Sequence, residues 1–223
     1  AVVAGPLGGD PDTADIFLPG GRVPREGDTL LQPDLAATLG QLRIAGVGDL
    51  HQGALARRLA ESSIRAGGGI TLAALRAALP QYSPAPKLAI GGGDSIAFLP
   101  TDGGVAAGAA WRVLAGNPAA GDAAAARAAG AAAAWRRGAW GTNAQAALDA
   151  REVPGGSLPP LPASTGFVTL DRNGNAVACA LTMNNLFGTG RVAPQTGVLL
   201  AASPAVVPPP LLSAAIVYAA RTR

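Results

Sequence analysis

The chain has 223 residues, of which 49% are apolar, and its formal net charge at pH 7 is +3. This length is enough for one large domain or two small ones with a real core. The basic residues are scattered and do not alternate with aromatic residues, which argues against nucleic-acid binding. No apolar run approaches the ~20 residues of a membrane-spanning helix, and the single cysteine, Cys179, excludes an intrachain disulfide and a multi-cysteine metal site.

Helices dominate the prediction for the first 140 residues. Residues 1–33 are predicted to be rich in loops, because Gly, Pro and Asp punctuate short apolar pieces there. Helical spacing or composition then predicts helices over 34–39, 52–66, 72–79, 102–114 and 122–137. In the second of these, we expect Leu55, Leu59 and Ile64 to lie near one face.

Two short strands and a long linker complete this part of the chain. Strands are predicted at 87–90 and 95–99, around the run Gly91-Gly92-Gly93-Asp94. The triple glycine could cradle a phosphate, but no lysine follows it, so a plain hairpin turn is favoured. Residues 138–163 carry a run of prolines and glycines and are predicted to be an exposed linker without regular structure.

A second hairpin is predicted directly after this linker. Asn173-Gly174 is a strong turn signal between the apolar runs 167–170 and 176–181. If these two residues form a type I′ turn, Ser164 faces Met183, and a longer loop shifts the pairing by one residue. Both runs are apolar on both faces, which predicts a buried sheet covered by other layers.

The start of this hairpin combines hydroxyl and amide side chains. In either register, Ser164 lies beside Thr182 and Asn184. If the chain were cut before Ser164, the new α-amino group, with a pKa of about 8, could act as the base for the hydroxyl of the same residue. The alternative is that Ser164 and Thr165 only end a loop, and the local sequence alone favours that simpler interpretation.

The residues around the turn carry a family resemblance. Residues 171–190 read Asp-Arg-Asn-Gly-Asn-Ala-Val-Ala, then Thr-Met-Asn and Phe-Gly-Thr-Gly, and residues 196–200 read Thr-Gly-Val-Leu-Leu. This run closely resembles the gamma-glutamyltransferase (gamma-glutamyltranspeptidase, glutathione hydrolase) family. The similarity extends upstream, where four segments resemble the later part of that family's large subunit: 16–19, 27–28, 32–39 and 68–72.

The resemblance implies a fold and a processing event. The expected fold is α+β, namely a partial four-layer αββα N-terminal-nucleophile hydrolase with two stacked sheets between helical layers. The family's proenzyme cuts itself into a large and a small subunit. Residues 1–163 are therefore expected to be the C-terminal part of a large-subunit-like region, and residues 164–223 the start of a small-subunit-like catalytic region.

The resemblance also implies roles for individual residues. Counting back from Asp171, the family's nucleophilic threonine falls on Ser164, which keeps the hydroxyl and loses a methyl; Thr165 is the other residue that could head the cut subunit. The second active-site threonine falls on Thr182, where it would hold the hydroxyl or the amino group of the nucleophile. The substrate-binding asparagine falls on Asn184.

The chain departs from the family pattern where the substrate is held. The family has two asparagines and then acidic or amide residues in positions where this chain has Ala201, Ala202, Ser203 and Val206. Its Arg-Pro-Leu-Ser-Ser run corresponds to 208–213, so Ser203 and Ser213 are the substrate-binding candidates here. Loss of a charged clamp costs on the order of 2–5 kcal/mol of recognition, which indicates a changed, less polar substrate.

The sequence thus predicts a self-processing amidase or acyltransferase with an acyl-enzyme mechanism. The substrate would be a small-molecule amide or gamma-glutamyl compound, and the cut chain would form a heterodimer of large and small subunits. The alternative is an inactive or truncated family member that acts as a structural or binding protein, and self-cleavage discriminates between the two. No metal or organic cofactor is implied. The family suggests a periplasmic or secreted location, although no export signal is visible in this chain.

Overall fold

The structure, a computed structural model, describes residues 3–153 and 156–219. It is a mixture of helices and short antiparallel strands, as the α+β prediction requires. Within the described ranges the chain forms two compact units. The first unit combines the chain up to Gln81 with Asn185–Ser203, and the second combines Tyr82–Asn184 with the chain from Pro204 onward.

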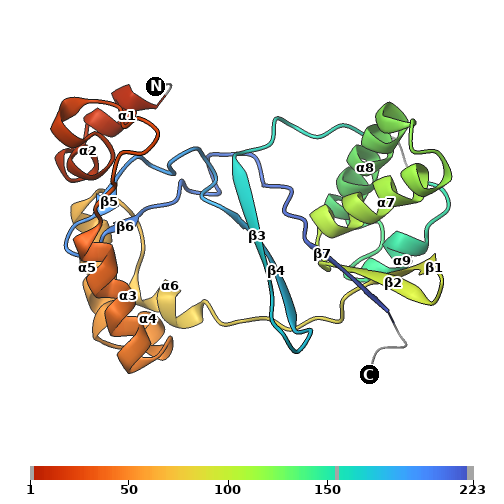
Figure 1. The fold of residues 1–223 in the computed structure, drawn as a ribbon, viewed down its shortest axis with the longest axis horizontal. Coiled ribbons are helices and arrows are strands. Elements are labelled where there is room, and N and C mark those ends of the chain that lie inside the picture. The colour runs from red at the N-terminus through yellow and green to blue at the C-terminus, as the bar shows by residue number, and fades with distance from the viewer. Residues whose placement is uncertain (1–2, 154–155, 220–223) are drawn as a thin grey trace. The chain divides into compact units, whose positions relative to one another are not determined.

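The first unit is mainly helical (Figure 1). Its elements are α1 (Ala4–Gly8), α2 (Pro11–Phe17), the 3-10 helix η1 (Pro19–Gly21), α3 (Pro33–Ala45), α4 (Gly48–Gln52), α5 (Ala54–Arg65), α6 (Leu72–Ala77), β5 (Val192–Ala193) and β6 (Val198–Leu199). The helices predicted around 34–39, 52–66 and 72–79 are all present, and α6 begins where predicted because the Thr71 side chain accepts a hydrogen bond from the Ala74 amide.

One expectation for this unit is incomplete and another is wrong. Residues 1–33 are rich in loops as expected, but they also form short helices, and α2 begins because Asp10 accepts a hydrogen bond from the Thr13 amide and Pro11 occupies its first position. Both features start a helix, although Pro and Asp also occur in loops. On α5, Leu55 and Leu59 are buried as expected, but Ile64 is 66% exposed and small residues such as Ser63 take its place on the buried face.

The segment that contains β5 and β6 is held against the helices by threonine hydroxyls. The Thr13 hydroxyl on α2 accepts a hydrogen bond from the Val192 amide at 2.9 Å, and the Thr38 hydroxyl on α3 donates to the Thr196 carbonyl at 2.8 Å. Thr13, Thr38 and Thr196 are all buried. Parts of the sequence more than 150 residues apart therefore share one core.

The second unit holds the longer strands. Its elements are β1 (Lys87–Gly91), β2 (Asp94–Phe98), α7 (Asp102–Gly116), α8 (Gly121–Arg136), α9 (Ala144–Asp149), β3 (Ser164–Leu170), β4 (Ala176–Thr182) and β7 (Ala215–Ala219). The predicted hairpin around the triple glycine is confirmed as β1–β2, and β7 pairs with the other edge of β2 in an antiparallel sheet of order β1-β2-β7. Helices α7 and α8 lie side by side (Figure 1) and pack through small residues.

The linker prediction for 138–163 is wrong at its start. Residues 144–149 form α9, where the Asn143 side chain accepts a hydrogen bond from the Ala146 amide and caps the helix. Leu148 on α9 is only 2% exposed and packs with Leu88, Ile96 and Phe98. Residues 150–153 and 156–163 contain no helix or strand, as predicted, and the remaining linker residues, 154 and 155, lie outside the described residues.

The second predicted hairpin is present as β3–β4, with a longer loop than two residues. Leu170 pairs with Ala176 and Ser164 pairs with Thr182, so Ser164 does not face Met183. The loop is longer because Asp171 and Asn175 close it through a backbone hydrogen bond of 3.0 Å, and Gly174 adopts φ 83° within it. This is the one-residue shift that a longer loop produces.

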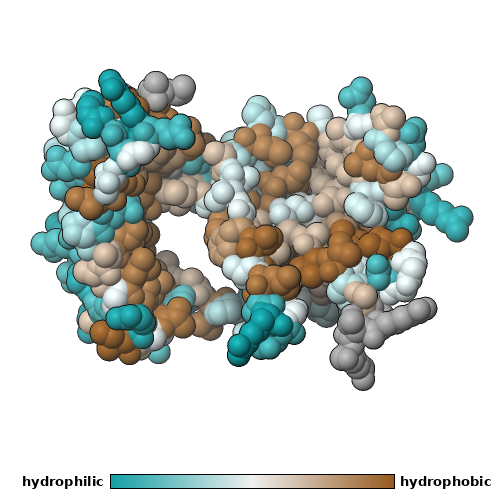
Figure 2. Space-filling model, viewed as in Figure 1, coloured by the Kyte–Doolittle hydropathy of each residue, from teal (hydrophilic) through white to brown (hydrophobic). Residues whose placement is uncertain are grey.

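The hairpin is not a buried sheet within this chain. Every residue of β3 is exposed, and the exposed large apolar side chains include Phe167, Val168, Leu170, Val177 and Leu181. In Figure 2, hydrophobic residues lie along the β3–β4 hairpin and hydrophilic residues lie at its tip. The pattern of apolar residues indicates a preference for burial, but within the described residues β3 stays uncovered and β4 is half-buried only at Ala178, Cys179, Ala180 and Thr182.

Candidate active site

The open end of the β3–β4 hairpin brings three of the predicted site residues together. Ser164 is the first residue of β3, Thr182 is the last residue of β4, and the two are directly paired. Asn184 follows two residues later, where its backbone amide meets the Thr182 side chain. Paired residues in an antiparallel sheet have side chains within reach of each other, so the strand register itself assembles this cluster.

The Thr182 hydroxyl contacts the peptide bond that the sequence analysis marks for cleavage. Its Oγ1 lies 2.6 Å from the carbonyl oxygen of Ala163, and it accepts a hydrogen bond from the Asn184 amide at 2.9 Å. The Ala163 carbonyl belongs to the peptide bond between Ala163 and Ser164. Thr182 therefore places a hydrogen-bond donor on the oxygen that would gain negative charge if the Ser164 hydroxyl attacked that carbonyl.

Asn184 has an unusual backbone conformation. Its φ is 59°, in the left-handed region that L-residues other than Gly, Asn and Asp seldom adopt. The conformation turns the chain sharply after β4, directly after the amide that donates to Thr182. Asparagine is therefore suited to this position through its backbone as well as through its side chain.

The turn at the other end of the hairpin depends on one carboxylate. Asp171 Oδ1 accepts hydrogen bonds from the amides of Asn173 and Asn175, and Oδ2 accepts from the Asn175 side chain at 2.7 Å. Hydrogen bonds from the Asn175 side chain and backbone, followed by those from Asn173 and Gly174, lower the pKa of Asp171 below its ordinary value of 3.8. The Asn-Gly pair predicts the turn but not this role of Asp171, for which an Asp shortly before an Asn-Gly pair is the signal.

The two candidate serines, Ser203 and Ser213, lie further along the sequence than Ser164, Thr182 and Asn184, and they belong to different units. Ser203 is an exposed residue at the end of the second segment of the first unit. Ser213 is an exposed residue of the second unit, just before β7. Hydrogen bonds hold the backbone on both sides of Ser213. The Leu212 carbonyl accepts a hydrogen bond from the Thr101 hydroxyl at 3.2 Å, and the Ala214 carbonyl accepts one from the Leu99 amide.

We call residues 208–214, which carry Ser213, the proline strap. Arg136 on α8 donates to the carbonyls of Pro209 and Pro210 and forms an ion pair with Asp102 on α7. Gly103 allows the strap to lie directly on α7, because a Cβ at that position would come within 2.0 Å of the Leu212 carbonyl oxygen. Ser213 is a candidate from the sequence, whereas no sequence pattern marks the arginine that holds its segment.

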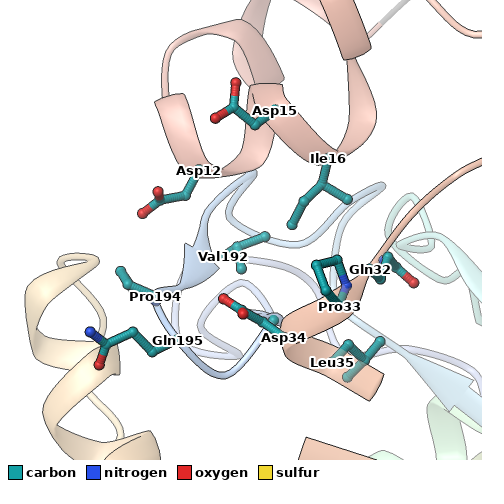
Figure 3. A pocket seen from close by; sticks show the side chains of 11 residues that line it. Asp12, Asp15, Ile16, Gln32, Pro33, Asp34, Leu35, Val192, Pro194 and Gln195 are labelled. Atoms are coloured by element: carbon teal, nitrogen blue, oxygen red, sulfur yellow. The ribbon is translucent and has the colours of Figure 1, made fainter. Parts of the chain in front are cut away.

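A hollow of about 200 Å³ lies within the first unit, and none of the predicted site residues lines it. Figure 3 shows Asp12 on α2 and Asp34 on α3 on different sides of it, with Val192 and Gln195 from the β5–β6 segment. Its walls combine carboxylates with apolar side chains.

No cluster of three or more His, Cys, Asp or Glu residues with metal-binding geometry occurs among residues 3–153 and 156–219. No helix described here is long and apolar enough to span a membrane.

Comparison with known proteins identifies the family. The gamma-glutamyltranspeptidase family profile matches residues 4–135, which is more than half of the chain, and the chain therefore belongs to the gamma-glutamyltranspeptidase family. The resemblance found in the sequence is thus confirmed. The chain is also 40% identical over 57 residues to the glutathione hydrolase proenzymes of Bacillus subtilis strain 168 and Bacillus subtilis subsp. natto. This match covers 26% of this chain and 10% of each relative.

A solved structure shares the fold. The cephalosporin acylase from Bacillus halodurans superimposes with a TM-score of 0.61 at 21% identity, over 90% of this chain and 40% of the acylase chain. At this identity the likeness concerns the fold alone. The chain spans only part of the length of each relative that it matches, one tenth of the curated proenzymes and two fifths of the acylase.

Proposed function

We propose that the chain is part of a self-processing amidase or acyltransferase whose nucleophile is Ser164. Family membership supports an enzyme that works on amide bonds, and the observation that carries the proposal is the hydrogen bond from Thr182 Oγ1 to the Ala163 carbonyl oxygen. Such a hydrogen bond polarises the carbonyl of the peptide bond next to the serine hydroxyl, which supports attack by that serine.

Self-cleavage would proceed by transfer of the acyl group from nitrogen to oxygen. The Ser164 oxygen forms a bond to the Ala163 carbonyl carbon, the bond from that carbon to the Ser164 nitrogen breaks, and the hydroxyl proton ends on the nitrogen. Thr182 stabilises the charge on the carbonyl oxygen while both bonds are partly formed. Water then hydrolyses the ester, which leaves a carboxylate on Ala163 and a free α-amino group on Ser164.

The same serine would then act on substrate. With an α-amino pKa of about 8, the new N-terminus accepts the proton of the Ser164 hydroxyl near neutral pH. The hydroxyl attacks the amide carbonyl of the substrate, the amino group returns the proton to the leaving amine, and an acyl-enzyme forms. Water or an acceptor amine resolves it. After cleavage the Thr182 hydroxyl loses the Ala163 carbonyl as its partner and is available to hold the nucleophile.

The substrate-binding roles remain with Asn184, Ser203 and Ser213. Ala201 and Ala202 stand where the family has asparagines, so we propose an acyl group without the full set of charged contacts that a free gamma-glutamyl group uses. The complete protein would adopt the four-layer N-terminal-nucleophile fold. The cut would separate a large subunit that contains residues 1–163 from a small subunit that contains residues 164–223, and the two would stay associated. The protein would act in the periplasm or outside the cell.

The first experiment is the intact mass of the full-length protein that contains this chain, beside its Ser164→Ala variant. We expect the wild type to yield a piece that begins at Ser164 and the variant to remain whole. A piece that begins at Thr165 would assign the nucleophile to that residue instead. A folded wild-type protein that stays uncut after prolonged incubation would favour the non-catalytic alternative, a structural or binding protein of the same family.

A further inference from the structure

The backbone of Asn184 fixes the direction of the Thr182 hydroxyl proton. An amide N–H can only donate a hydrogen bond and a carbonyl oxygen can only accept one. Because Thr182 Oγ1 is 2.9 Å from the Asn184 nitrogen and 2.6 Å from the Ala163 oxygen, it must accept from the first and donate to the second. The single proton of this hydroxyl is therefore directed at the carbonyl next to Ser164.

The chain leaves this arrangement through the left-handed conformation of residue 184. Outside glycine, the described residues with positive φ are Asn184, Phe187 and Gln195. A hydroxyl that accepts from the amide two residues later forms a local turn, and φ 59° at Asn184 bends the chain immediately after that amide. Among residues with a Cβ, asparagine adopts this region with the least strain.

We propose that Asn184 is a positioning residue for self-cleavage, through its backbone, in addition to the substrate-binding role proposed for its side chain. The amide holds the Thr182 hydroxyl on the Ala163 carbonyl, and the left-handed conformation turns the chain directly after that amide. A residue that resists this conformation would relax by shifting the peptide group that carries the amide. The hydrogen bond that the hydroxyl accepts also strengthens the one that it donates. This inference rests on the proposed self-cleavage at Ser164.

The backbone role and the side-chain role require different residues at position 184. Glycine has no side chain but adopts positive φ freely, whereas alanine and valine strain the backbone to increasing degrees. We expect Asn184→Gly to cleave itself within about threefold of the wild-type rate. The strain of an L-residue in this region corresponds to a slowing of about 5- to 30-fold for Asn184→Ala, and valine should be slower still.

Turnover of substrate by the cleaved protein should rank the variants differently. Asn184→Gly and Asn184→Ala both lack the amide side chain, so both should bind substrate more weakly, with KM raised to a similar extent. Rapid cleavage together with impaired substrate binding in Asn184→Gly is the signature of a backbone role. A residue that served only the stability of the fold would not divide the two activities in this way.

The experiment is a time course of intact mass for the full-length protein and its Asn184 variants, each also in a Thr182→Val background. Valine at 182 keeps the shape and removes the hydroxyl, so we expect the differences among the Asn184 variants to fall to less than about twofold there. Equal cleavage rates for Gly, Ala and Val with Thr182 present would overturn the inference. So would differences that persist in full without the Thr182 hydroxyl.

Two controls separate this result from other failures. If Asn184→Val does not fold, Asn184→Ala against Asn184→Gly still decides the question, with circular dichroism confirming that both are folded. An uncut but folded wild-type protein overturns the proposed function together with this inference. A wild type that cuts normally, with no dependence on φ at position 184, overturns only the inference.

Discussion

Arg136 and Asp102 form an ion pair between α8 and the first turn of α7, with Nε 2.6 Å from Oδ2 and about one fifth of each side chain exposed. The same guanidinium group donates to the Pro209 carbonyl at 3.2 Å and to the Pro210 carbonyl at 3.0 Å. One side chain thus joins two helices to the proline strap that leads into β7.

Replacement of Arg136 by alanine should destabilise the second unit. Hydrogen bonds to charged groups contribute about 1.5–3 kcal/mol each, and removal of the arginine leaves the mostly buried Asp102 carboxylate without its cationic partner. We expect a loss of at least about 2 kcal/mol in denaturant unfolding. The control is Arg137→Ala, the exposed neighbouring arginine, which should change stability by less than about 0.5 kcal/mol. Equal losses would show that Arg136 contributes only as a surface charge.

Gly197→Ala should destabilise the first unit strongly. Gly197 has φ 65°, and a Cβ there would come within 2.3 Å of the Leu35 amide nitrogen at the start of α3. Backbone strain alone costs about 1–3 kcal/mol, and the contact with main-chain atoms adds to it. Hydrogen exchange of the α3 amides is the appropriate measurement, because it reports on this unit separately.

The matched control for this change is Gly40→Ala in the middle of α3. A Cβ at Gly40 meets no atom within 4 Å, and Gly40 has no positive φ. Alanine is preferred over glycine inside helices by about 1 kcal/mol, so this substitution should stabilise the unit. The same chemical change should therefore have opposite signs at two glycines, and protection lost at both positions would contradict the prediction.

The β3–β4 turn should loosen in acid. Hydrogen bonds from Asn175 lower the pKa of Asp171 in the folded chain, so the ionised carboxylate stabilises the fold. That contribution is fully present above the ordinary value of 3.8 and is lost as the pH falls through the lower, folded pKa. NMR shifts of the Gly174 and Asn175 amides should follow this titration, and the Asp171→Asn variant should show none of it. A midpoint above 3.8 would mean that the sign is wrong.

Leu148→Ala should show that α9 is part of the core. Leu148 is 2% exposed and lies against Gly108 of α7 as well as the β1–β2 hairpin. Leucine-to-alanine changes in cores cost about 2–5 kcal/mol. Leu161→Ala, in the segment before β3 and 49% exposed, is the control and should cost less than about 1 kcal/mol in the same unfolding experiment.

The comparison of α3 with α9 shows where sequence patterns suffice for the fold. The α3 helix has a proline start and thirteen residues rich in leucine and alanine, so its existence follows from local chemistry. The α9 helix has six residues and forms because Leu148 finds a hydrophobic site made by β1, β2 and α7. Strand β7 likewise pairs with a strand more than a hundred residues away, and no local pattern encodes that partner.

The candidate site was predictable to the level of strand pairing and not beyond it. The turn signal placed Ser164 beside Thr182 to within one residue, and the Asp171–Asn175 closure of the loop decided the register. The hydrogen bond between Thr182 and Ala163 depends on a side-chain rotamer, and the φ of Asn184 depends on how the chain leaves the strand. Neither is expressed in residue spacing.

The division of the chain into two units has a consequence for the product of self-cleavage. A cut at 163/164 falls inside the second unit, and residues from both sides of it build each unit: Val192 bonds to Thr13 in the first, and β7 pairs with β2 in the second. Each piece would contribute to both cores, so the two pieces would be held together at two places at once. This holds them more tightly than a single docking surface of the same kind would. They should co-migrate on gel filtration in native buffer and part only when both units unfold.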